Sequence, residues 1–360
     1  MRSFVLGLLI AIHGTTSTLG AERIDKPTFL LAWGKRGGKP GEFHSPINIA
    51  INQRDEIFVG DLNNSRIQKF SFEGKYLGGF DVQPDKPPRK QVAIGGMALA
   101  EDEQAPGELG CLIYLAFMNQ NRLGVYTETG KLVREWGKKG NSSAGWAGGY
   151  QSGKGDGEFD QPGGIVLIPD SALFVTDQCN HRVQKFTRAG KFLAKWGEYG
   201  DKPGQFGASE VAGSRFAGPH FLARDSQGRL YTTEGVPGRV QQLSPEGRPL
   251  AVWGDKGDQP GGFGSYMTRY AKFSFGPIGI MVDKYDRVWV SSLNDRVQMF
   301  TPEGKFVLGI GGHGTEPGQF HRPHGMAMDS HDYLYVVDSS NHRIQKFAIP
   351  APNHPKSGRR

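Results

Sequence analysis

An acidic residue followed closely by asparagine, histidine and arginine occurs twice in this chain and could carry acid–base chemistry. Asp177 precedes Asn180 and His181 in the segment 173–197 (LFVTDQCNHRVQKFTRAGKFLAKWG), and VDSSNHR repeats the arrangement near the C-terminus. A carboxylate beside a histidine can act as a general acid and base pair. A catalytic site is usually unique, whereas a turn needs hydrogen bonds from Asp or Asn side chains wherever it recurs. The repetition therefore favours a structural role for these residues.

Two further histidines stand at matching places in the chain and could hold a metal ion. His220 in GPHFL and His324 in RPHGM each follow a proline at the start of an expected strand. Imidazoles that converge can bind zinc, which takes three protein ligands and a water in catalytic sites. His44 or His321 could complete such a site, and zinc or calcium is the candidate cofactor. The alternative is that both histidines only line a wet channel.

Three long insertions between the expected strands combine aromatic and basic residues. They span 137–161, 197–218 and 254–276, and each exceeds the roughly 12 to 15 residues at which a loop without its own structure becomes unusual. Aromatic faces beside cations suit sugars, peptides or anionic polymers. The alternative is that the aromatic residues pin the loops and the cations only solubilise them. The candidate ligand-binding residues are Trp146, Tyr150, Arg215, Arg269, Tyr270 and Lys272.

A repeat positions all of these candidates. Each copy begins after a Pro or Gly and holds short runs that alternate apolar and polar residues, separated by turns such as DSQG and PEGK. This pattern indicates strands joined by hairpins. The arginine that opens the third run recurs at separations of 56, 60, 57, 57 and 47 residues, and a period of about 40 to 50 residues is typical of a propeller blade. These arginines are Arg66, Arg122, Arg182, Arg239, Arg296 and Arg343.

The count of fourth runs predicts how the ring closes. The last copy ends after its third run, whereas FLLAWG, from Phe29 to Gly34, stands alone before the first copy. Pairing of these two would complete six blades and remove the exposed edge of an open ring. The sequence therefore predicts an all-β, six-bladed β-propeller in which aspartates cap the turns and arginines bridge the strands. The residues assigned to this repeat structure are Asp61, Arg66, Asp177, Arg182, Arg296, Asp338 and Arg343.

The copies resemble NHL repeats. TDQCNHR and VDSSNHR fit the name-giving pattern closely, GDLNNSR has Ser65 where those copies have histidine, and AFMNQNR and TEGVPGR depart further. The resemblance covers essentially all of the chain after residue 21 and is to exported, bacterial-type NHL propellers with six blades. Some NHL propellers bind single-stranded RNA on a basic face, and basic residues with interleaved aromatics suit that function.

The paired histidines also resemble, more distantly, those of the peptidyl-hydroxyglycine amidating lyase, another six-bladed propeller. In that family histidines from alternate blades hold zinc in the channel. The resemblance implies a third histidine where this chain has Met97, a catalytic tyrosine where the closest match has Gln178, and an acidic residue where Gly325 stands. These three departures argue against the same lyase reaction here.

The first 21 residues are typical of a secretory signal peptide. Arg2 precedes an apolar run at 4–12, and a stretch of small residues ends at Glu22 and Arg23. The run is far shorter than the roughly 18 apolar residues of a membrane helix. We therefore expect a secreted or periplasmic protein without membrane insertion, with one propeller at 22–349 and a disordered basic tail at 350–360.

Composition and charge narrow the class of partner. Glycine makes up 53 of 360 residues without the period of collagen, which indicates turn-rich β-structure. The net charge of +7 permits nucleic acid, anionic glycan or acidic protein partners, and export removes the first of these. Cys111 and Cys179 are expected at opposite ends of equivalent strands, too far apart for a disulfide.

These observations predict a monomeric, exported binding module that holds a peptide, glycan or protein ligand on one face. A zinc-dependent lyase is the alternative, and nucleic-acid binding is a second alternative that export disfavours. Whether the protein is an enzyme stays open at this stage.

Overall fold

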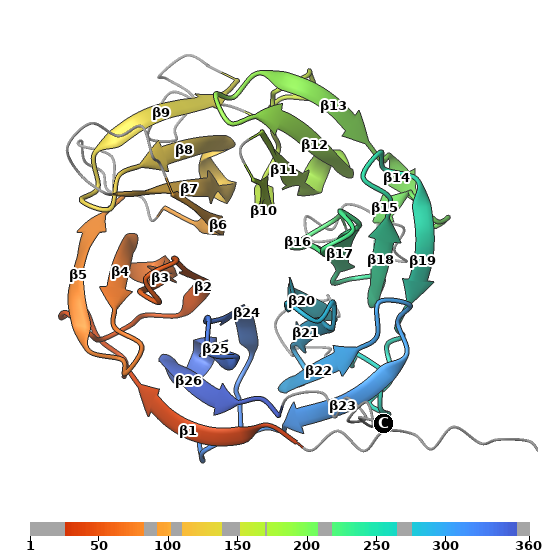
Figure 1. The fold of residues 1–360 in the computed structure, drawn as a ribbon. Coiled ribbons are helices and arrows are strands. Elements are labelled where there is room, and N and C mark those ends of the chain that lie inside the picture. The colour runs from red at the N-terminus through yellow and green to blue at the C-terminus, as the bar shows by residue number, and fades with distance from the viewer. Residues whose placement is uncertain are drawn as a thin grey trace, which may run out of the picture.

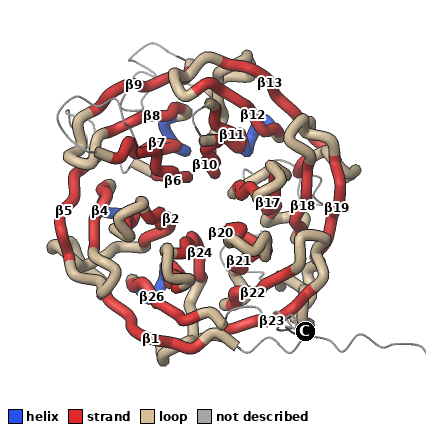
Figure 2. The backbone as a smooth tube through the Cα atoms, in the orientation of Figure 1, coloured by secondary structure: helices blue, strands red, loops and turns tan. Residues whose placement is uncertain are grey.

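The computed structural model describes residues 26–82, 92–101, 110–138, 152–169, 171–207, 218–264 and 276–350. In these residues the backbone forms six four-stranded sheets arranged in a ring, so the predicted all-β, six-bladed propeller is confirmed (Figure 1). Each blade runs from an inner strand beside the axis to an outer strand at the rim, and helix is confined to short turns (Figure 2). The expected signal peptide at 1–21 and the tail at 351–360 lie outside the described residues.

In blades 1 to 5 the strands follow one another outward in chain order, whereas the outer strand of blade 6 comes from the N-terminal end of the chain. Blades 1 and 2 contain β2 (Pro46–Ile51), β3 (Ile57–Asp61), β4 (Arg66–Phe70), β5 (Tyr76–Asp81), β6 (Ile94–Glu101), β7 (Cys111–Phe117), β8 (Arg122–Tyr126) and β9 (Leu132–Gly137). Blades 3 and 4 contain β10 (Pro162–Ile168), β11 (Ala172–Asp177), β12 (Arg182–Thr187), β13 (Phe192–Trp196), β16 (Leu222–Arg224), β17 (Leu230–Glu234), β18 (Arg239–Leu243) and β19 (Pro249–Trp253). Blades 5 and 6 contain β20 (Pro277–Val282), β21 (Val288–Ser292), β22 (Arg296–Phe300), β23 (Phe306–Gly311), β24 (Pro323–Met328), β25 (Tyr333–Asp338), β26 (Arg343–Ala348) and β1 (Thr28–Trp33).

The N-terminal strand closes the ring, as predicted. β1 pairs antiparallel with β26, from Thr28 opposite Ala348 to Trp33 opposite Ile344. Gly34, which was expected inside this strand, lies just beyond it. Its φ is +96°, a backbone conformation that residues other than glycine rarely adopt. A Cβ there would also approach the Phe43 ring to 2.5 Å. The last blade therefore takes its outer strand from the other end of the chain, and no open edge remains in the ring.

Short 3-10 turns join the second and third strands on one face of the ring, which we call the top face. Connections between blades reach the same face, since the Asn63 N–H donates to the His44 carbonyl at 3.0 Å. The 3-10 turns are η1 (Leu62–Asn64), η2 (Met118–Gln120), η3 (Gln178–Asn180) and η4 (Ser339–Asn341). Two further strands, β14 (Tyr199–Gly200) and β15 (Phe206–Gly207), form a parallel pair in the connection between blades 3 and 4.

The recurrent aspartates tie each top-face turn to the connection that enters the same blade. Asp177 Oδ2 accepts from Arg182 Nε at 2.8 Å, and its Oδ1 accepts from the Asp160 N–H at 2.8 Å. Asp61 and Asp338 make the equivalent contacts in blades 1 and 6. None of the three carboxylates caps the 3-10 turn that follows it. The expected capping is therefore corrected, because each carboxylate bonds the incoming loop and the strand arginine instead.

Two blades build the same turn without this carboxylate. Blade 2 has Phe117 at the position of the aspartate, and the Arg122 guanidinium lies 4.1 Å from the centre of that ring. Blade 5 has Ser292 there, and Arg296 donates to the Asp258 carbonyl of the preceding connection. The strand arginine thus contacts an aromatic ring in blade 2 and a backbone carbonyl in blade 5, so the turn can form without the aspartate.

Tryptophans of the outer strands pack between blades, as predicted. Trp196 lies against the outer turn of the next blade at Gly247, where an added Cβ would come within 1.9 Å of the indole. Gly247 also has a φ of +82°, so the position favours glycine for two reasons. The other pairs of this kind are Trp33 with Gly74, Trp136 with Gly190 and Trp253 with Gly304.

The apolar core is divided into clusters between neighbouring blades. The middle strands supply most of it, because strands such as β3 and β17 are buried along their whole length, whereas β5 alternates between exposed and half-buried residues. No disulfide joins the described Cys111 and Cys179, as predicted, and Cys111 is buried. In the part of the chain that the structure describes, no helix is long and apolar enough to span a membrane.

Candidate functional site at the top face

Each blade contributes one residue near the start of its inner strand to a set that surrounds the axis of the ring, and we call this set the axial column. In five blades these residues follow the residue that pairs with the end of the second strand, as Pro162 pairs with Asp177 and Pro323 with Asp338. In blade 4 His220 lies before β16, and its N–H donates to the Thr233 carbonyl. Both histidines singled out in the sequence belong to this set, in blades 4 and 6. The axial positions are Ile47, Gly95, Gly163, His220, Ile278 and His324.

Hydrogen bonds between blades hold the backbone of this column in place. Thr176 Oγ1 of blade 3 donates to the His220 carbonyl at 2.7 Å, and Ser291 Oγ of blade 5 donates to the His324 carbonyl at 2.6 Å. Thr233 Oγ1 donates to the Ile278 carbonyl at 2.6 Å in the same way. Because a neighbouring blade bonds the backbone carbonyl of each histidine, the backbone that carries the two imidazoles is held rigidly.

Both axial imidazoles are neutral at physiological pH. Burial, and to a smaller extent repulsion between the protonated forms of His220 and His324, lowers the pKa of His220 to about 3. Burial likewise lowers the pKa of His324 to about 4. His324 Nδ1 lies 2.8 Å from the Arg322 carbonyl, to which it donates its proton, so the Nε2 of His324 carries the lone pair. A neutral imidazole with this tautomer can accept a hydrogen bond or bind a metal ion.

The structure corrects the expected place of a third histidine. Gly95, and not Met97, is the blade 2 residue of the axial column, because Ile94 pairs with Phe117 at the end of β7 as Pro162 pairs with Asp177 in blade 3. Met97 is buried in the cluster between blades 1 and 2. A Cβ on Gly95 would come within 2.4 Å of Met118 Cγ and 2.7 Å of the Pro162 carbonyl. Blade 2 therefore has no room for a ligand at this position.

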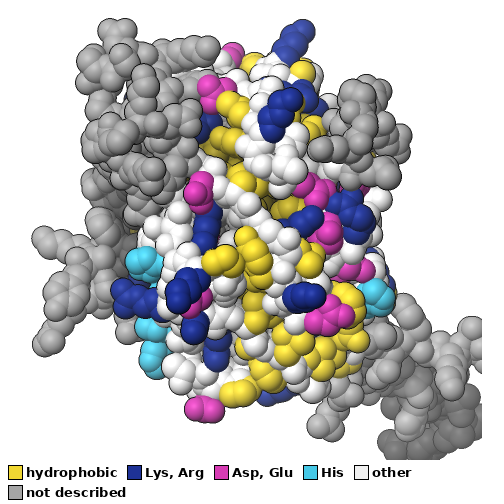
Figure 3. Space-filling view, turned by 90° about the vertical axis from the view of Figure 1, so that its left-hand side faces the viewer, with side chains coloured by type: hydrophobic (Ala, Val, Ile, Leu, Met, Phe, Trp, Pro, Cys, Tyr) yellow, Lys and Arg dark blue, Asp and Glu magenta, His cyan; other side chains and the backbone are white. Residues whose placement is uncertain are grey.

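The other candidate third ligands lie elsewhere on the top face. The His44 ring packs against the His342 ring, and the His321 ring packs against the His313 ring. In Figure 3 histidine side chains gather along one edge of the described surface, and another lies at the opposite edge. Within the described ranges, no three His, Cys, Asp or Glu residues are arranged to share one metal ion. Two axial histidines alone do not make the donor set of a catalytic zinc site.

Gln178 is the residue near the axis that sequence reasoning undervalued. It opens η3 and is fully buried, and among the described residues its Oε1 has no hydrogen-bond partner. Its Nε2 lies 3.6 Å from Met118 Sδ. A Cβ on Gly163 would sit 2.7 Å from Gln178 Nε2 and 2.4 Å from the His220 carbonyl, so only a glycine allows these groups to pack this closely. The equivalent turns start with Leu62, Met118 and Ser339, so the sequence varies freely at this position and gave no signal that marked Gln178.

The glycine where an acidic residue was expected has a steric reason. A Cβ on Gly325 would approach the Ile47 carbonyl of blade 1 to 2.8 Å. The inner strands of blades 6 and 1 therefore come too close there for a carboxylate side chain. The candidate ligand-binding residues Trp146, Tyr150, Arg215, Arg269, Tyr270 and Lys272 lie outside the described residues.

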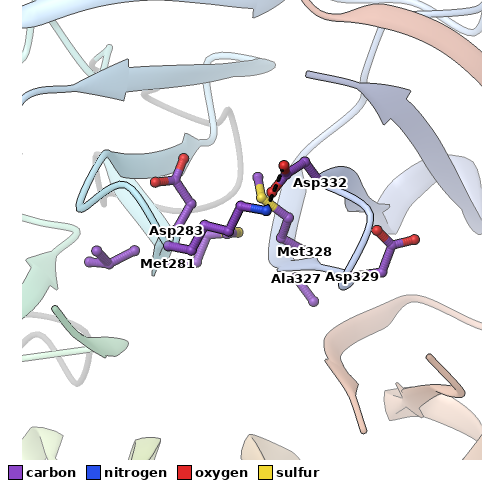
Figure 4. A pocket seen from close by; sticks show the side chains of 8 residues that line it. Met281, Asp283, Ala327, Met328, Asp329 and Asp332 are labelled. Carbon is purple, nitrogen blue, oxygen red and sulfur yellow. Dashed lines mark ion pairs between the residues drawn. The ribbon is translucent and has the colours of Figure 1, made fainter. Parts of the chain in front are cut away.

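A pocket of about 270 Å³ opens at the other ends of the inner strands of blades 5 and 6 (Figure 4). Lys284 reaches across it to Asp332, with 2.8 Å between Nζ and Oδ2. Asp283 faces away from the pocket and accepts from Arg287 Nε at 2.6 Å and Trp289 Nε1 at 2.9 Å. Lys284, Asp332 and Asp283 are thus already paired with protein groups, so this pocket is a structural contact between two blades and offers no reactive group.

Comparison with known sequences supports the assignment of the repeat. The family profile described as NHL repeat matches residues 159–186 and 320–347, which carry the Asp177 and Asp338 networks. These are NHL repeats. A solved WD40 β-propeller domain of Doa1 has a TM-score of 0.52 with 10% sequence identity, over 89% of this chain and 97% of that one. That likeness concerns the fold alone.

Two curated proteins illustrate how far the sequence similarity extends. Peptidylglycine alpha-amidating monooxygenase from Rattus norvegicus is 34% identical over 139 residues, which cover 36% of this chain and 13% of that protein. E3 ubiquitin-protein ligase TRIM32 from Mus musculus is 24% identical over 233 residues, which cover 64% of this chain and 30% of that protein. The match therefore spans less than a third of the length of either relative, and this NHL propeller is distantly similar to a part of each.

Proposed function

We propose that this NHL propeller is an exported binding module that holds an uncharged polar group of a peptide, glycan or protein at the axial end of its top face. The observation that carries the proposal is the buried Gln178 amide, whose Oε1 has no hydrogen-bond partner in the described part of the chain. A buried acceptor left unsatisfied costs about 1–3 kcal/mol. An N–H or O–H group of a ligand would recover that cost once the side chains that cover the amide, such as Met118, move aside.

Electrostatics support an uncharged group at this place. His220 and His324 are neutral at physiological pH because burial lowers both pKa values, so neither attracts an anion there. A peptide amide or a sugar hydroxyl supplies the donor that Gln178 Oε1 lacks without bringing a charge out of water. The basic and aromatic residues of the long connections would then bind more distant parts of the same ligand.

Variants of Gln178 test the binding proposal. We expect the wild-type protein to bind blocked tripeptide amides or neutral oligosaccharides in calorimetric titrations, and Gln178→Leu to weaken that binding at least about tenfold, since one hydrogen bond to a buried group contributes about 1.4 kcal/mol. Gln53→Leu is the matched control, because Gln53 is exposed at the turn between β2 and β3. The proposal fails if no probe binds, or if both variants bind as the wild type does.

Export and a monomeric state are part of the same proposal, supported by the charged, apolar and small residues of the segment 1–21. The mass of the protein recovered from its producing cells checks the first point. A mature chain that starts near residue 21 or 22 is expected, and an intact N-terminus in the recovered protein contradicts export. Sedimentation of the purified protein measures whether it is a monomer.

A metal-dependent lyase is the second candidate function. The similarity to the amidating monooxygenase and the neutral tautomer of His324 favour it, whereas the lack of room at Gly95 opposes it. Zinc that co-purifies with the wild type but not with a double variant, His220→Ala with His324→Ala, would support this candidate. Cleavage of a peptidyl-α-hydroxyglycine would establish it, and a wild-type protein that holds no zinc under these conditions would dismiss it.

A further inference from the structure

A carboxylate orients one exposed histidine at the junction of blades 5 and 6. His313 follows β23, and its Nδ1 lies 2.8 Å from Asp295 Oδ2. The other oxygen of the same carboxylate, Oδ1, accepts from the Arg322 N–H at 2.7 Å. Because an ionised carboxylate only accepts hydrogen bonds, His313 carries its proton on Nδ1. The Nε2 of His313 therefore presents a lone pair, and the side chain is 71% exposed.

A second histidine stands at the distance that a shared metal ion requires. His321 precedes β24 in the next blade, and its ring centroid lies 5.0 Å from that of His313, with 75° between the ring planes. Two imidazoles bound to one ion at metal–nitrogen distances of about 2.1 Å place their centroids roughly 5 Å apart. A carboxylate that holds the far nitrogen of a histidine is the usual support of a metal-binding imidazole.

The junction of blades 6 and 1 has the same backbone but the wrong chemistry for a metal ion. Arg36 occupies the place of His313, since Arg36 bridges to Phe43 as His313 bridges to Phe320. His44 and His342 take the places of His321 and Asp295. His342 Nδ1 accepts from the Ser45 N–H at 3.0 Å, so its proton is on Nε2 and no lone pair faces outward. The two rings are 5.9 Å apart, and the guanidinium of Arg36 repels a cation.

We propose that His313 and His321 bind one divalent transition-metal ion through their Nε2 atoms, with Asp295 as the positioning residue. Among the described residues no third His, Cys, Asp or Glu joins these ligands, and both oxygens of Asp295 are already engaged. Water therefore fills the remaining positions, which are open to a donor from outside. Imidazole ligands suit zinc, nickel and copper, with copper binding most tightly in the Irving–Williams order. The ion also links blade 5 to blade 6.

Metal titration of the full-length, metal-free protein tests this site. We expect zinc and nickel each to bind with a stoichiometry of one at this junction and to raise the thermal midpoint, because a ligand of the folded state stabilises it. His313→Ala and His321→Ala should each abolish this binding. Asp295→Asn should weaken it at least about tenfold, since its amide N–H faces Nδ1 and moves the histidine proton to Nε2. Binding that persists in both histidine variants would overturn the proposal, as would a wild type that binds no ion.

Matched variants separate this site from the axial histidines and from a general loss of structure. His44→Ala and the double variant His220→Ala with His324→Ala should leave the junction affinity unchanged. The nitrogen-15 spectrum of the imidazoles should show His313 protonated at Nδ1 in the wild type and at Nε2 in Asp295→Asn. Protonation of wild-type His313 at Nε2 would contradict the proposal even if a variant failed to fold. The proposed ligand-binding function does not depend on this result.

Discussion

The top-face turns repeat from blade to blade, whereas the axial column changes at almost every blade. Asp61, Asp177 and Asp338 bond the same set of atoms in blades 1, 3 and 6. The axial positions instead hold two isoleucines, two glycines and two histidines. In a ring of equivalent blades, residues that recur serve the backbone that every blade needs. Residues that break the recurrence, such as His220 and Gln178, are therefore the place to look for a specific function.

Removal of a recurrent residue should have the largest effect on stability. We expect Asp177→Ala to lower the free energy of unfolding by about 3–5 kcal/mol, because the buried Arg182 keeps its carbonyl partners but loses the carboxylate that balances its charge. Ser292→Ala, at the same position of blade 5, should cost only about 1 kcal/mol, since it removes one neutral hydrogen bond. Urea unfolding monitored by tryptophan fluorescence measures both. Equal losses would show that the blades do not differ in the way the contacts indicate.

Acid should expose the contribution of the axial histidines. Their folded pKa values lie below the ordinary value of 6.5, so the unfolded chain binds more protons between about pH 3 and pH 6.5. Stability from the neutral imidazoles is complete above pH 6.5 and is lost as the pH falls through this window. We expect the double variant His220→Gln with His324→Gln to lose less unfolding free energy than the wild type between pH 7 and pH 4.5. Parallel pH curves would contradict this prediction.

Gln178→Leu should have the smallest effect on stability, and its sign should be opposite to that of Asp177→Ala. Removal of an unsatisfied buried acceptor relieves a desolvation cost, while a leucine fills a similar volume. We expect the free energy of unfolding to stay the same or to rise by up to about 1 kcal/mol in urea titrations. A loss above that size would place Gln178 with the structural residues and remove the main support for its role in binding.

Most of the fold could be predicted from the sequence because each blade repeats the same pattern of strands and turns. Alternating runs, turn residues and a recurring arginine placed six blades, and the missing fourth run of the last copy placed the closing strand from Phe29. The role of the aspartates was only half predicted. Their recurrence showed that they were structural, but no local pattern shows that a carboxylate bonds an incoming loop some 17 residues away, as Asp177 bonds Asp160.

The candidate site was less readable, since it depends on register and on contacts between distant segments. The resemblance implies the axial position of blade 2 at Met97, but Ile94 pairs with Phe117 at the end of β7, so Gly95 holds that position. Asp295 lies in the turn between β21 and β22, whereas His313 and His321 lie at the two ends of the connection from β23 to β24. The left-handed backbone shared by Asp295 and His342 and the bridges of His313 to Phe320 and of Arg36 to Phe43 show that the two junctions are equivalent, and these features belong to the folded backbone.

The pairing of β1 with β26 also determines the order in which the molecule can be assembled. Thr28 and Ala348 are 320 positions apart, and bringing the ends of so long a chain together costs about 5 kcal/mol of loop entropy by the usual logarithmic law. That entropy is offset only when the final strand is available. During synthesis β1 waits without its partner while five blades can already form, and a chain that stops before Arg343 would keep an unpaired strand at its start and an unfinished blade at its end.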